Sequence, residues 1–460
     1  MMYRPSSEFR LWDTWIFQAE DTFHLFHLQN PVGSEWDTLG HAISTDLVHW
    51  KKQDDIFMKG PQGAWDSGAF LTGMVIPYED QYAMSFAFPV DGGQQIGIMF
   101  SKDLYNWTKH PENPVLKACQ PYKPNDDWRD AYLMKVDDGY EALICARMPD
   151  NQSCIARMKS SDLIHWDVLP PIATPSVSQC EVPEYFQIGD KHYLIFACGG
   201  RVDDKSRKNT AGTRYLISDS KTGTYVMPED SLLLGSGNGR FDCYVGRTIE
   251  VNGQKILYYQ NCGPRPAEGA PKIIRQNTDG TLWLQYWDGL AGLETGVILD
   301  KVTSGEQTGY DWKMDGNRLI GHKDYGISGY LLSPVIKDIN LTCTVNIENG
   351  NRAAVLFRHD ENMGKGSAVI LDAKSGNVEI ARTENGQSVM QDTMLLGIKA
   401  GKDYTVRIFA RSEFADCYVD DRFIFSTVVD DTQLSGKVGF AVDSGIASFY
   451  DLRIASLESE

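Results

Sequence analysis

Acidic residues stand at the entrance of several short apolar segments in this sequence. They are Asp13 in WDTW, Asp130 in RDAYL, Glu181 in EVPEYF and Asp242 in FDCY. An acid is disfavoured inside a strand and usually belongs to a turn or cap, so one such position alone says little. Several carboxyl groups brought to one place repel one another, which raises the pKa of at least one of them. Because a general acid needs a raised pKa, we interpret these residues as a candidate functional cluster.

A seven-residue pattern recurs along the chain. It reads STDLVHW at 44–50, SKDLYNW at 101–107 and SSDLIHW at 160–166, with a degenerate copy, SDSKTGTY, at 218–225. The aromatic residues that end the copies are 57, 59 and 59 residues apart. Ser and Asp form local side-chain-to-backbone bonds, so each copy predicts a turn that its aromatic residue anchors. The acids of the three full copies, Asp46, Asp103 and Asp162, are therefore assigned to turns.

The segments before these turns predict the fold. A pair of β-rich segments precedes each turn, as at 22–28 and 40–44, and a fifth unit lies at 255–260 and 281–287. No window shows a helical period with caps. About four short strands per unit, repeated five times, predict an all-β, five-bladed β-propeller. The first strand of each blade lines the central channel, so the four acids should converge at one mouth, where unit two contributes 65–70.

The pattern changes near residue 289. The stretch 289–312 is rich in glycine and polar residues, and from about residue 320 short strands alternate with turn signals. This pattern predicts a β-sandwich. The expected division is a catalytic β-propeller at 1–295, a linker at 296–318 and a β-sandwich at 319–460.

Composition limits the classes of partner that this chain can be expected to bind. The net charge of −18 argues against nucleic acid and against an anionic membrane, and it fits a small neutral ligand. The nine cysteines are scattered without a CxxC pair, so we expect neither a disulfide framework nor a zinc site, and no metal or cofactor. The N-terminus lacks the apolar core of a signal peptide and no apolar run could span a bilayer, so a cytoplasmic protein is expected. A homo-oligomer is left open.

The quoted segments resemble glycoside hydrolase family 32, with features similar to families 68 and 43. The similarity is carried by FHLF at 23–26, NP at 30–31, GHAISTDLVHW at 40–50, RD at 129–130 and EVPEYF at 181–186. It covers roughly residues 10–290. The resemblance implies a five-bladed propeller with a lectin-like C-terminal β-sandwich, acting on a small β-fructofuranoside or fructooligosaccharide.

The resemblance also implies a role for each acid. Asp13 would be the nucleophile, and Glu181 the general acid and base, of a retaining double displacement. Asp130 would hold sugar hydroxyls in the transition state, and Arg129 would also bind the sugar. Further candidates for substrate binding are Trp12, Trp36 and Trp65 as stacking surfaces, together with Gln29 and Asp242.

Some residues depart from the family pattern and leave alternatives open. The segment WDTW is closer to family 68, and the strand glutamine is replaced by Leu28, with Gln29 one residue later. A one-residue shift on a strand points a side chain to the opposite face unless a bulge intervenes. A fructosyltransferase, an arabinofuranosidase-like hydrolase and a non-catalytic sugar-binding propeller therefore remain alternatives.

Overall fold

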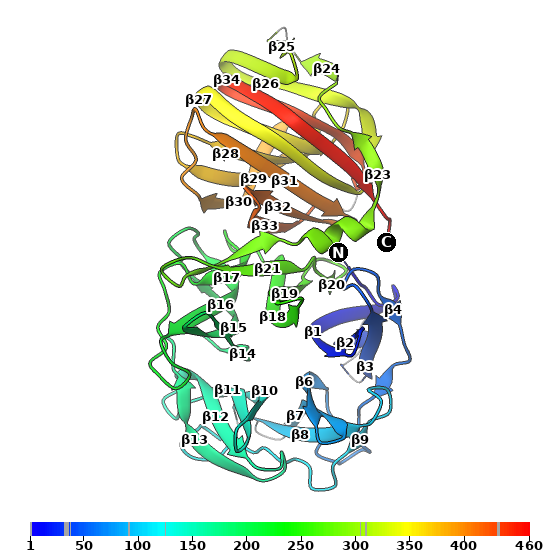
Figure 1. The fold of residues 1–460 in the computed structure, drawn as a ribbon, viewed down its shortest axis with the longest axis vertical. Coiled ribbons are helices and arrows are strands. Elements are labelled where there is room, and N and C mark those ends of the chain that lie inside the picture. Colours follow the sequence, from blue (N-terminus) through cyan, green and yellow to red (C-terminus); the bar gives the residue numbers. More distant parts are fainter. Residues whose placement is uncertain are drawn as a thin grey trace.

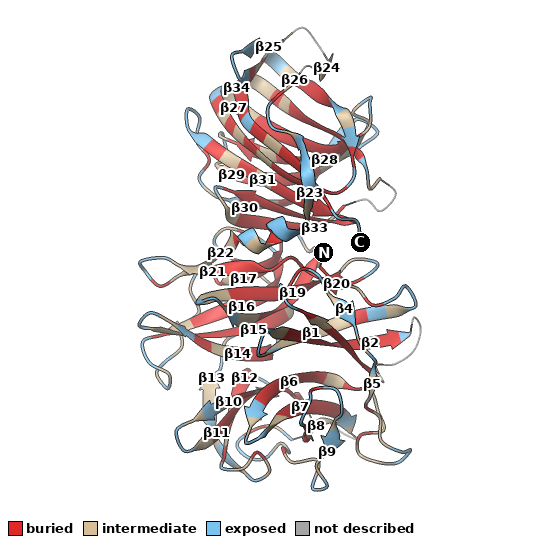
Figure 2. Cartoon of the chain, turned by 45° about the vertical axis from the view of Figure 1, so that its right-hand side comes forward, coloured by how far each residue is buried: buried red, intermediate tan, exposed pale blue. Residues whose placement is uncertain are grey.

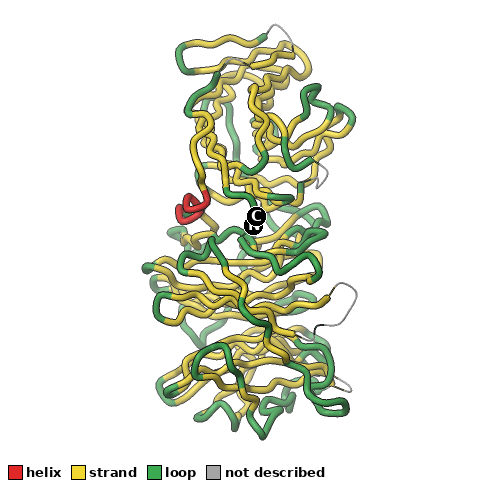
Figure 3. The backbone as a smooth tube through the Cα atoms, turned by 90° about the vertical axis from the view of Figure 1, so that its right-hand side faces the viewer, coloured by secondary structure: helices red, strands yellow, loops and turns green. Residues whose placement is uncertain are grey.

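The computed structural model describes residues 2–31, 36, 38–90, 93–124, 126–303, 305–308, 311–429 and 433–460. It is an all-β structure in two parts, a ring of sheets and a stack of longer strands above it (Figure 1). Figure 3 shows a single helical turn, η1 (Asp288–Leu293), at the junction of the two parts, where both termini also lie. No helix within the described ranges has the length and apolar character needed to cross a membrane.

Four separate sheets form most of the ring, and the chain builds each one in order from the axis outward. The first contains β1 (Phe9–Ala19), β2 (Thr22–Pro31), β3 (Thr38–Ser44), β4 (Lys51–Lys52) and β5 (Ile56–Phe57). The second contains β6 (Leu71–Tyr78), β7 (Gln81–Val90), β8 (Gly93–Ser101) and β9 (Thr108–Lys109). The third contains β10 (Trp128–Val136), β11 (Gly139–Arg147), β12 (Ser153–Ser160) and β13 (Trp166–Ala173). The fourth contains β14 (Glu181–Ile188), β15 (Lys191–Val202), β16 (Thr210–Ser218) and β17 (Leu232–Ser236).

The last strands of the ring belong to a larger sheet. They are β18 (Cys243–Val251), β19 (Gln254–Asn261), β20 (Ala267–Glu268), β21 (Lys272–Gln276) and β22 (Leu282–Tyr286). They form one 17-stranded sheet with the C-terminal strands, because β22 pairs with β33 at Gln285 and Arg422. The prediction of a five-bladed propeller is therefore wrong, since the residues that the structure describes form four separate blades. The physical reason is that the edge strand β22 satisfies its backbone groups with a strand far away in the sequence.

The C-terminal strands form the predicted β-sandwich. They are β23 (Glu294–Leu299), β24 (Gly305–Thr308), β25 (Trp312–Asp315), β26 (Arg318–Ile336), β27 (Ile339–His359), β28 (Lys365–Asp372), β29 (Asn377–Glu384), β30 (Gln387–Leu395), β31 (Asp403–Arg411), β32 (Phe414–Val419), β33 (Arg422–Val428) and β34 (Gly436–Leu457). The long strands β26 and β27 both pair with β34, and the inward side chains form one buried core. The expected linker, 296–318, contains β24, β25 and most of β23, which pair with β26 and β34.

Middle strands of the ring are buried on both faces, as the red strands of Figure 2 show. In β11 every residue from Tyr140 to Ala146 is buried, while the outer strands β4 and β9 carry exposed residues. Neighbouring sheets therefore pack face to face around the axis. A strand covered on both faces needs a continuous apolar run, which explains the sequence ALICA at 142–146. The buried Glu141 before it is paired with Arg157 at 2.9 Å.

The repeated seven-residue pattern forms the predicted turns. In the first copy Ser44 Oγ accepts hydrogen bonds from the backbone N–H groups of Asp46 and Leu47, at 3.1 and 2.9 Å. Asp46 Oδ1 accepts from the N–H groups of Val48 and His49, and the Trp50 indole donates to the Leu47 carbonyl. The same bonds recur in the copies at 101–107 and 160–166. The assignment of the three acids to turns is confirmed.

A buried ion pair joins the two parts of the molecule and allows a test of their coupling. Lys272 Nζ lies 2.7 Å from Asp416 Oδ2, and their side chains are 0% and 5% exposed. We expect Lys272→Met to lower the free energy of unfolding by about 3–5 kcal/mol, because it leaves the Asp416 charge buried and unpaired. Chemical denaturation measures this change.

The matched control for Lys272→Met is Lys102→Met. Lys102 pairs with Asp80 at 3.2 Å, but both side chains are 75% exposed. This change should cost less than about 1 kcal/mol. Equal losses in the two variants would contradict the structural role of the buried pair.

Candidate active site

The five innermost strands share one irregularity, which builds a cavity at the axis of the ring. Their pairing shifts register between Trp12 and Thr14, Leu71 and Met74, Arg129 and Tyr132, Glu181 and Glu184, and Tyr244 and Arg247. Such a β-bulge inserts an extra residue and re-aims the side chains around it. Asp130, Val182 and Val245 at these bulges have positive φ angles of 59°, 46° and 47°.

Each bulge supplies two consecutive residues to the cavity, whose volume is about 680 Å³. These pairs are Trp12 and Asp13, Leu71 and Thr72, Arg129 and Asp130, Glu181 and Val182, and Tyr244 and Val245. The remaining lining residues are Leu28, Trp36, Ser178, Gln179, Gly199, Gly200 and Phe241. In a regular strand successive side chains point to opposite faces, so a bulge is what allows two neighbours to share one cavity.

Asp13 has the more strongly raised pKa of the two buried aspartates. Its Oδ2 accepts a hydrogen bond from the Thr72 hydroxyl, and its buried Oδ1 has no hydrogen-bond partner among the described residues. The pKa of Asp13 is raised to about 7, first by burial and then by the charges of Asp130 and Glu181, while the Thr72 hydrogen bond and the Arg247 charge oppose the rise. Asp13 is therefore a carboxyl group whose protonation changes near neutral pH.

Asp130 is held by the backbone of the neighbouring sheet. The side chain is almost fully buried, and its Oδ2 accepts a hydrogen bond of 3.1 Å from the Val182 N–H group. Burial raises the pKa of Asp130 to about 6; the Arg129 guanidinium, 3.5 Å away, opposes this rise, and the Glu181 carboxylate adds to it.

Glu181 is oriented by two donors. Arg129 Nη2 donates to its Oε1 at 2.7 Å, and the Tyr244 hydroxyl donates to its Oε2. Burial and the Glu181 charge raise the pKa of Tyr244 well above its usual value, so the phenol stays protonated and can donate. Arg129 is itself fixed by Asp127 at 2.5 Å and Gln94 at 3.2 Å. Burial, with the neighbouring acids adding to it, thus raises the pKa of Asp13 and Asp130. The Glu181 side chain is held in place by its hydrogen bonds to Arg129 and Tyr244.

Six of the nine candidate residues line the cavity: Trp12, Asp13, Trp36, Arg129, Asp130 and Glu181. Gln29 does not line the cavity. Neighbouring side chains on β2 point to opposite faces, and Leu28 is the one that faces the cavity. The buried Gln29 amide lies 3.4 Å from the Thr38 hydroxyl. Trp65 packs against Phe86, with ring centroids 5.8 Å apart.

Asp242 also lies outside the lining, because its carboxylate is turned to Arg240. It accepts hydrogen bonds of 2.6 and 3.0 Å from Arg240. The residue of that segment that reaches the acids is Tyr244, two positions later. In the second sheet the corresponding residues are Leu71 and Thr72, a few positions beyond the expected stretch 65–70. Thr72 and Tyr244 were missed because neither is an acid, and only the register of the bulges would have located them.

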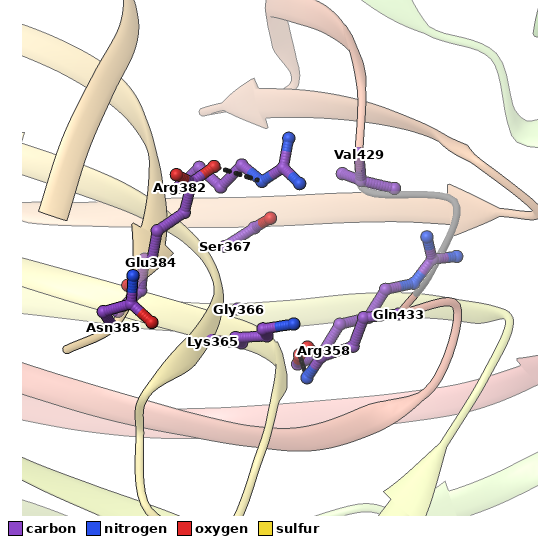
Figure 4. Close-up of a pocket in the computed structure, with 10 residues that line it drawn as sticks. Arg358, Lys365, Gly366, Ser367, Arg382, Glu384, Asn385, Val429 and Gln433 are labelled. Atoms are coloured by element: carbon purple, nitrogen blue, oxygen red, sulfur yellow. Dashed lines mark hydrogen bonds and ion pairs between the residues drawn. The ribbon is translucent and has the colours of Figure 1, made fainter. Parts of the chain in front are cut away.

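A second pocket, of about 280 Å³, lies in the sandwich and differs in chemistry (Figure 4). It is lined by Arg358, Lys365, Gly366, Ser367, Arg382, Thr383, Glu384, Asn385, Val429 and Gln433. Glu384 is its one lining carboxylate among the described residues, and it lies 3.1 Å from Arg382. Two-carboxylate chemistry therefore belongs to the cavity in the ring. Within the described ranges no group of three or more His, Cys, Asp or Glu side chains is arranged to hold a metal ion.

Comparison with known proteins agrees with this architecture. In the curated set, a sucrose-6-phosphate hydrolase of Pediococcus pentosaceus is 24% identical over 433 residues, covering 88% of this chain and 80% of the relative. An insoluble isoenzyme of rice β-fructofuranosidase is 26% identical over 182 residues, covering 36% of this chain but only 30% of the relative. The crystal structure of fructan 1-exohydrolase IIa from Cichorium intybus has the same fold, with a TM-score of 0.76, 14% identity, and coverage of 100% of this chain and 97% of that one.

A family model identifies the chain more directly. The model described as "Glycosyl hydrolases family 32 N-terminal domain" matches residues 15–259. This match contains β2 to β18 and the residues of the cavity from Leu28 to Val245. Since it covers more than half of the sequence, the chain belongs to glycosyl hydrolase family 32 and is a glycosidase.

Proposed function

We propose that the protein hydrolyses a small, neutral β-fructofuranoside with retention of configuration. Asp13 is the nucleophile, Glu181 is the general acid and base, and Asp130 holds sugar hydroxyls. The observation that carries the proposal is the convergence of these three carboxyl groups, from equivalent bulges on three strands, in one cavity. The names of the relatives, which act on fructosides, support the substrate class.

The chemistry needs both an ionised and a protonated carboxyl group. In the first step the Asp13 carboxylate attacks the anomeric carbon, while Glu181 gives its proton to the departing glycosidic oxygen. In the second step Glu181 takes a proton from water, whose oxygen attacks the same carbon and releases Asp13. Glu181 thus loses one proton in the first step and regains one in the second. Because the charges of Asp130 and Glu181 act on Asp13, the titrations of the three carboxyl groups are coupled.

The other lining residues would bind and orient the sugar. Arg129 and Tyr244 hold Glu181 in place through one hydrogen bond each. Trp12, Trp36 and Phe241 present aromatic surface on which a sugar ring can stack. We infer that the substrate enters as a chain end or disaccharide, because one cavity of about 680 Å³ holds all three acids.

The charges of the cavity favour a neutral substrate over a phosphorylated one. Arg129 is the single cation that lines it among the described residues, and it already contacts Asp127, Asp130 and Glu181. Of the cations nearby, Arg147 lies 2.7 Å from Asp127. Arg201 donates to the Gly239 carbonyl. Residues 32–35 and 37 beside Trp36 include no Lys or Arg. Within the lining, a phosphate dianion would thus meet three acids and one arginine that is already ion-paired.

Two expectations about the whole chain stay predictions. One is the division into a catalytic part at 1–295, a linker at 296–318 and a lectin-like sandwich at 319–460. The other is a cytoplasmic location, together with the open question of a homo-oligomer.

The roles of the acids are tested by isosteric substitution. Asp13→Asn and Glu181→Gln should each lower kcat on sucrose or 1-kestose by at least about 10²–10⁴-fold, because each removes a group that acts on the reacting atoms. For Glu181→Ala acting on a fructoside whose leaving group departs without a general acid, azide should restore turnover and yield a fructosyl azide, since a small anion can attack the covalent intermediate without a general base. The exposed Asp80→Asn serves as control and should keep wild-type activity. Wild-type turnover by Glu181→Gln would contradict the assignment of Glu181 as general acid and base.

The pKa of Asp13 is tested through Thr72. Loss of the Thr72 hydroxyl in Thr72→Val removes a bond that favours the Asp13 carboxylate, so the pKa of Asp13 should rise above about 7. An attacking Asp13 must be ionised, so activity falls as pH drops through this pKa, and the acid limb of kcat/KM should move to higher pH by about one unit. Thr72→Ser keeps the hydroxyl and should leave the limb unchanged. An equal shift in both variants would contradict this account.

The preference for a neutral substrate is tested with a matched pair of sugars. At low salt kcat/KM for sucrose 6-phosphate should be at least about 10-fold below that for sucrose, which corresponds to about 1.4 kcal/mol of repulsion. Added salt should bring the two kcat/KM values closer together, because it screens charge repulsion. A higher kcat/KM for the phosphorylated sugar would show that a cation outside the lining residues binds the phosphate.

A further inference from the structure

The segment 237–242, here called the wall segment, connects β17 to β18 and borders the cavity. Phe241 lines the cavity, and its ring centroid lies 4.7 Å from that of Tyr244. Tyr244 in turn donates a hydrogen bond to Glu181. The position of the wall segment therefore affects both the shape of the cavity and one of the two donors that orient Glu181.

Strands of the sandwich hold this segment from outside the ring. The Gly237 N–H group donates to Asp392 Oδ2 on β30 at 2.8 Å. Arg240 Nη1 donates to Gln391 Oε1 on β30 at 2.5 Å, and Arg240 Nη2 lies 3.3 Å from the Thr427 hydroxyl on β33. The approach is close, because a Cβ atom at Gly237 would lie 2.5 Å from Asp392 Oδ1.

Arg240 links the sandwich to the backbone of the wall segment around Phe241. Its Nε and Nη2 donate to both oxygens of Asp242, at 2.6 and 3.0 Å. A guanidinium is a rigid fork, so fixing one edge on Asp242 and the other on Gln391 also fixes the backbone between them. Phe241 is the residue between Arg240 and Asp242.

We propose that Gln391, Asp392 and Thr427 of the C-terminal sandwich are positioning residues of the active site. Gln391 and Thr427 act through Arg240, and Asp392 acts through the Gly237 N–H group. Together they hold Phe241 against Tyr244 and so fix the Tyr244 hydroxyl on Glu181. The sandwich thus forms part of the catalytic arrangement without contacting the substrate. The inference rests on the proposed role of Glu181 for its effect on turnover, but the effect on the wall segment is independent of that role.

The test compares two substitutions at one position. Gln391→Leu keeps the size of the side chain and removes the acceptor for Arg240, whereas Gln391→Glu keeps an acceptor. For Gln391→Leu we expect kcat on sucrose or 1-kestose to fall about 10-fold with a smaller change in KM, because small displacements of catalytic groups have large effects on rate. Gln391→Glu should stay within about twofold of wild type. Amide hydrogen exchange should speed up in 237–244 for Gln391→Leu alone.

A control variant on β33 separates positioning from general stability. Ser426 precedes Thr427, but its hydroxyl bonds to Asn261 at 3.0 Å and Tyr259 at 3.2 Å, away from the wall segment. Thr427→Val should reproduce part of the loss in kcat, while Ser426→Ala should change the melting temperature without changing kcat.

Two results would overturn the inference. One is unchanged exchange in 237–244 for Gln391→Leu, and the other is an equal loss of kcat in Ser426→Ala. Faster exchange with unchanged kcat in Gln391→Leu would show that the sandwich holds the wall segment, and it would overturn the link between that contact and turnover. Failure of the proposed function would be seen separately, as turnover by Glu181→Gln.

Discussion

The alternation of side chains along a β-strand is the constraint that governs this active site. A straight strand at the axis of the ring would offer every second residue to the cavity, and its neighbours would be buried between sheets. The bulges in β1, β6, β10, β14 and β18 remove this limit at one level of the ring. They carry a conformational cost, because Val182 and Val245 are β-branched residues at positive φ. Strain of about 1–3 kcal/mol at such positions persists only where the surrounding structure enforces it.

The second constraint is charge. Three carboxyl groups share the cavity with one lining arginine, and burial makes each negative charge more costly. Hydrogen bonds from Thr72, from the Val182 N–H group and from Tyr244 offset part of this cost. Beneath the bulges Arg247 and Glu184 form a buried pair at 3.6 Å, and the Arg247 charge lowers the pKa of both Asp13 and Asp130. Even with this opposition, burial keeps the pKa of Asp13 at about 7 and that of Asp130 at about 6, well above the usual range of an aspartate.

The sequence predicted the features that rest on local chemistry. The turn motif at 44–50 and its copies specify their own hydrogen bonds, so they could be read without a structure. Leu28 and Gln29 could be assigned to opposite faces by alternation alone, although Gln29 was still included among the candidates. What could not be predicted depends on distant pairing. The contact of Gln285 with Arg422, which joins the last ring strands to the sandwich, leaves no trace in either segment. The bulges are equally invisible in the sequence. They place Thr72 and Tyr244 in the cavity, where residues of 65–70 and Asp242 were expected.

The junction between ring and sandwich accounts for the departure from separate blades. A sheet that ended at β22 would expose an unpaired edge, and β33 pairs with it at Gln285 and Arg422. Once that pairing exists, β32 and β33 bring Asp416 and Thr427 against the ring, where they meet Lys272 and Arg240. Both cations lie on segments that flank β18 and β19, the strands that carry Tyr244 and Asn261. The same surface that closes the edge of the sheet therefore also supports one wall of the cavity. For this reason we regard the sandwich as a structural extension of the active site rather than as an appended module.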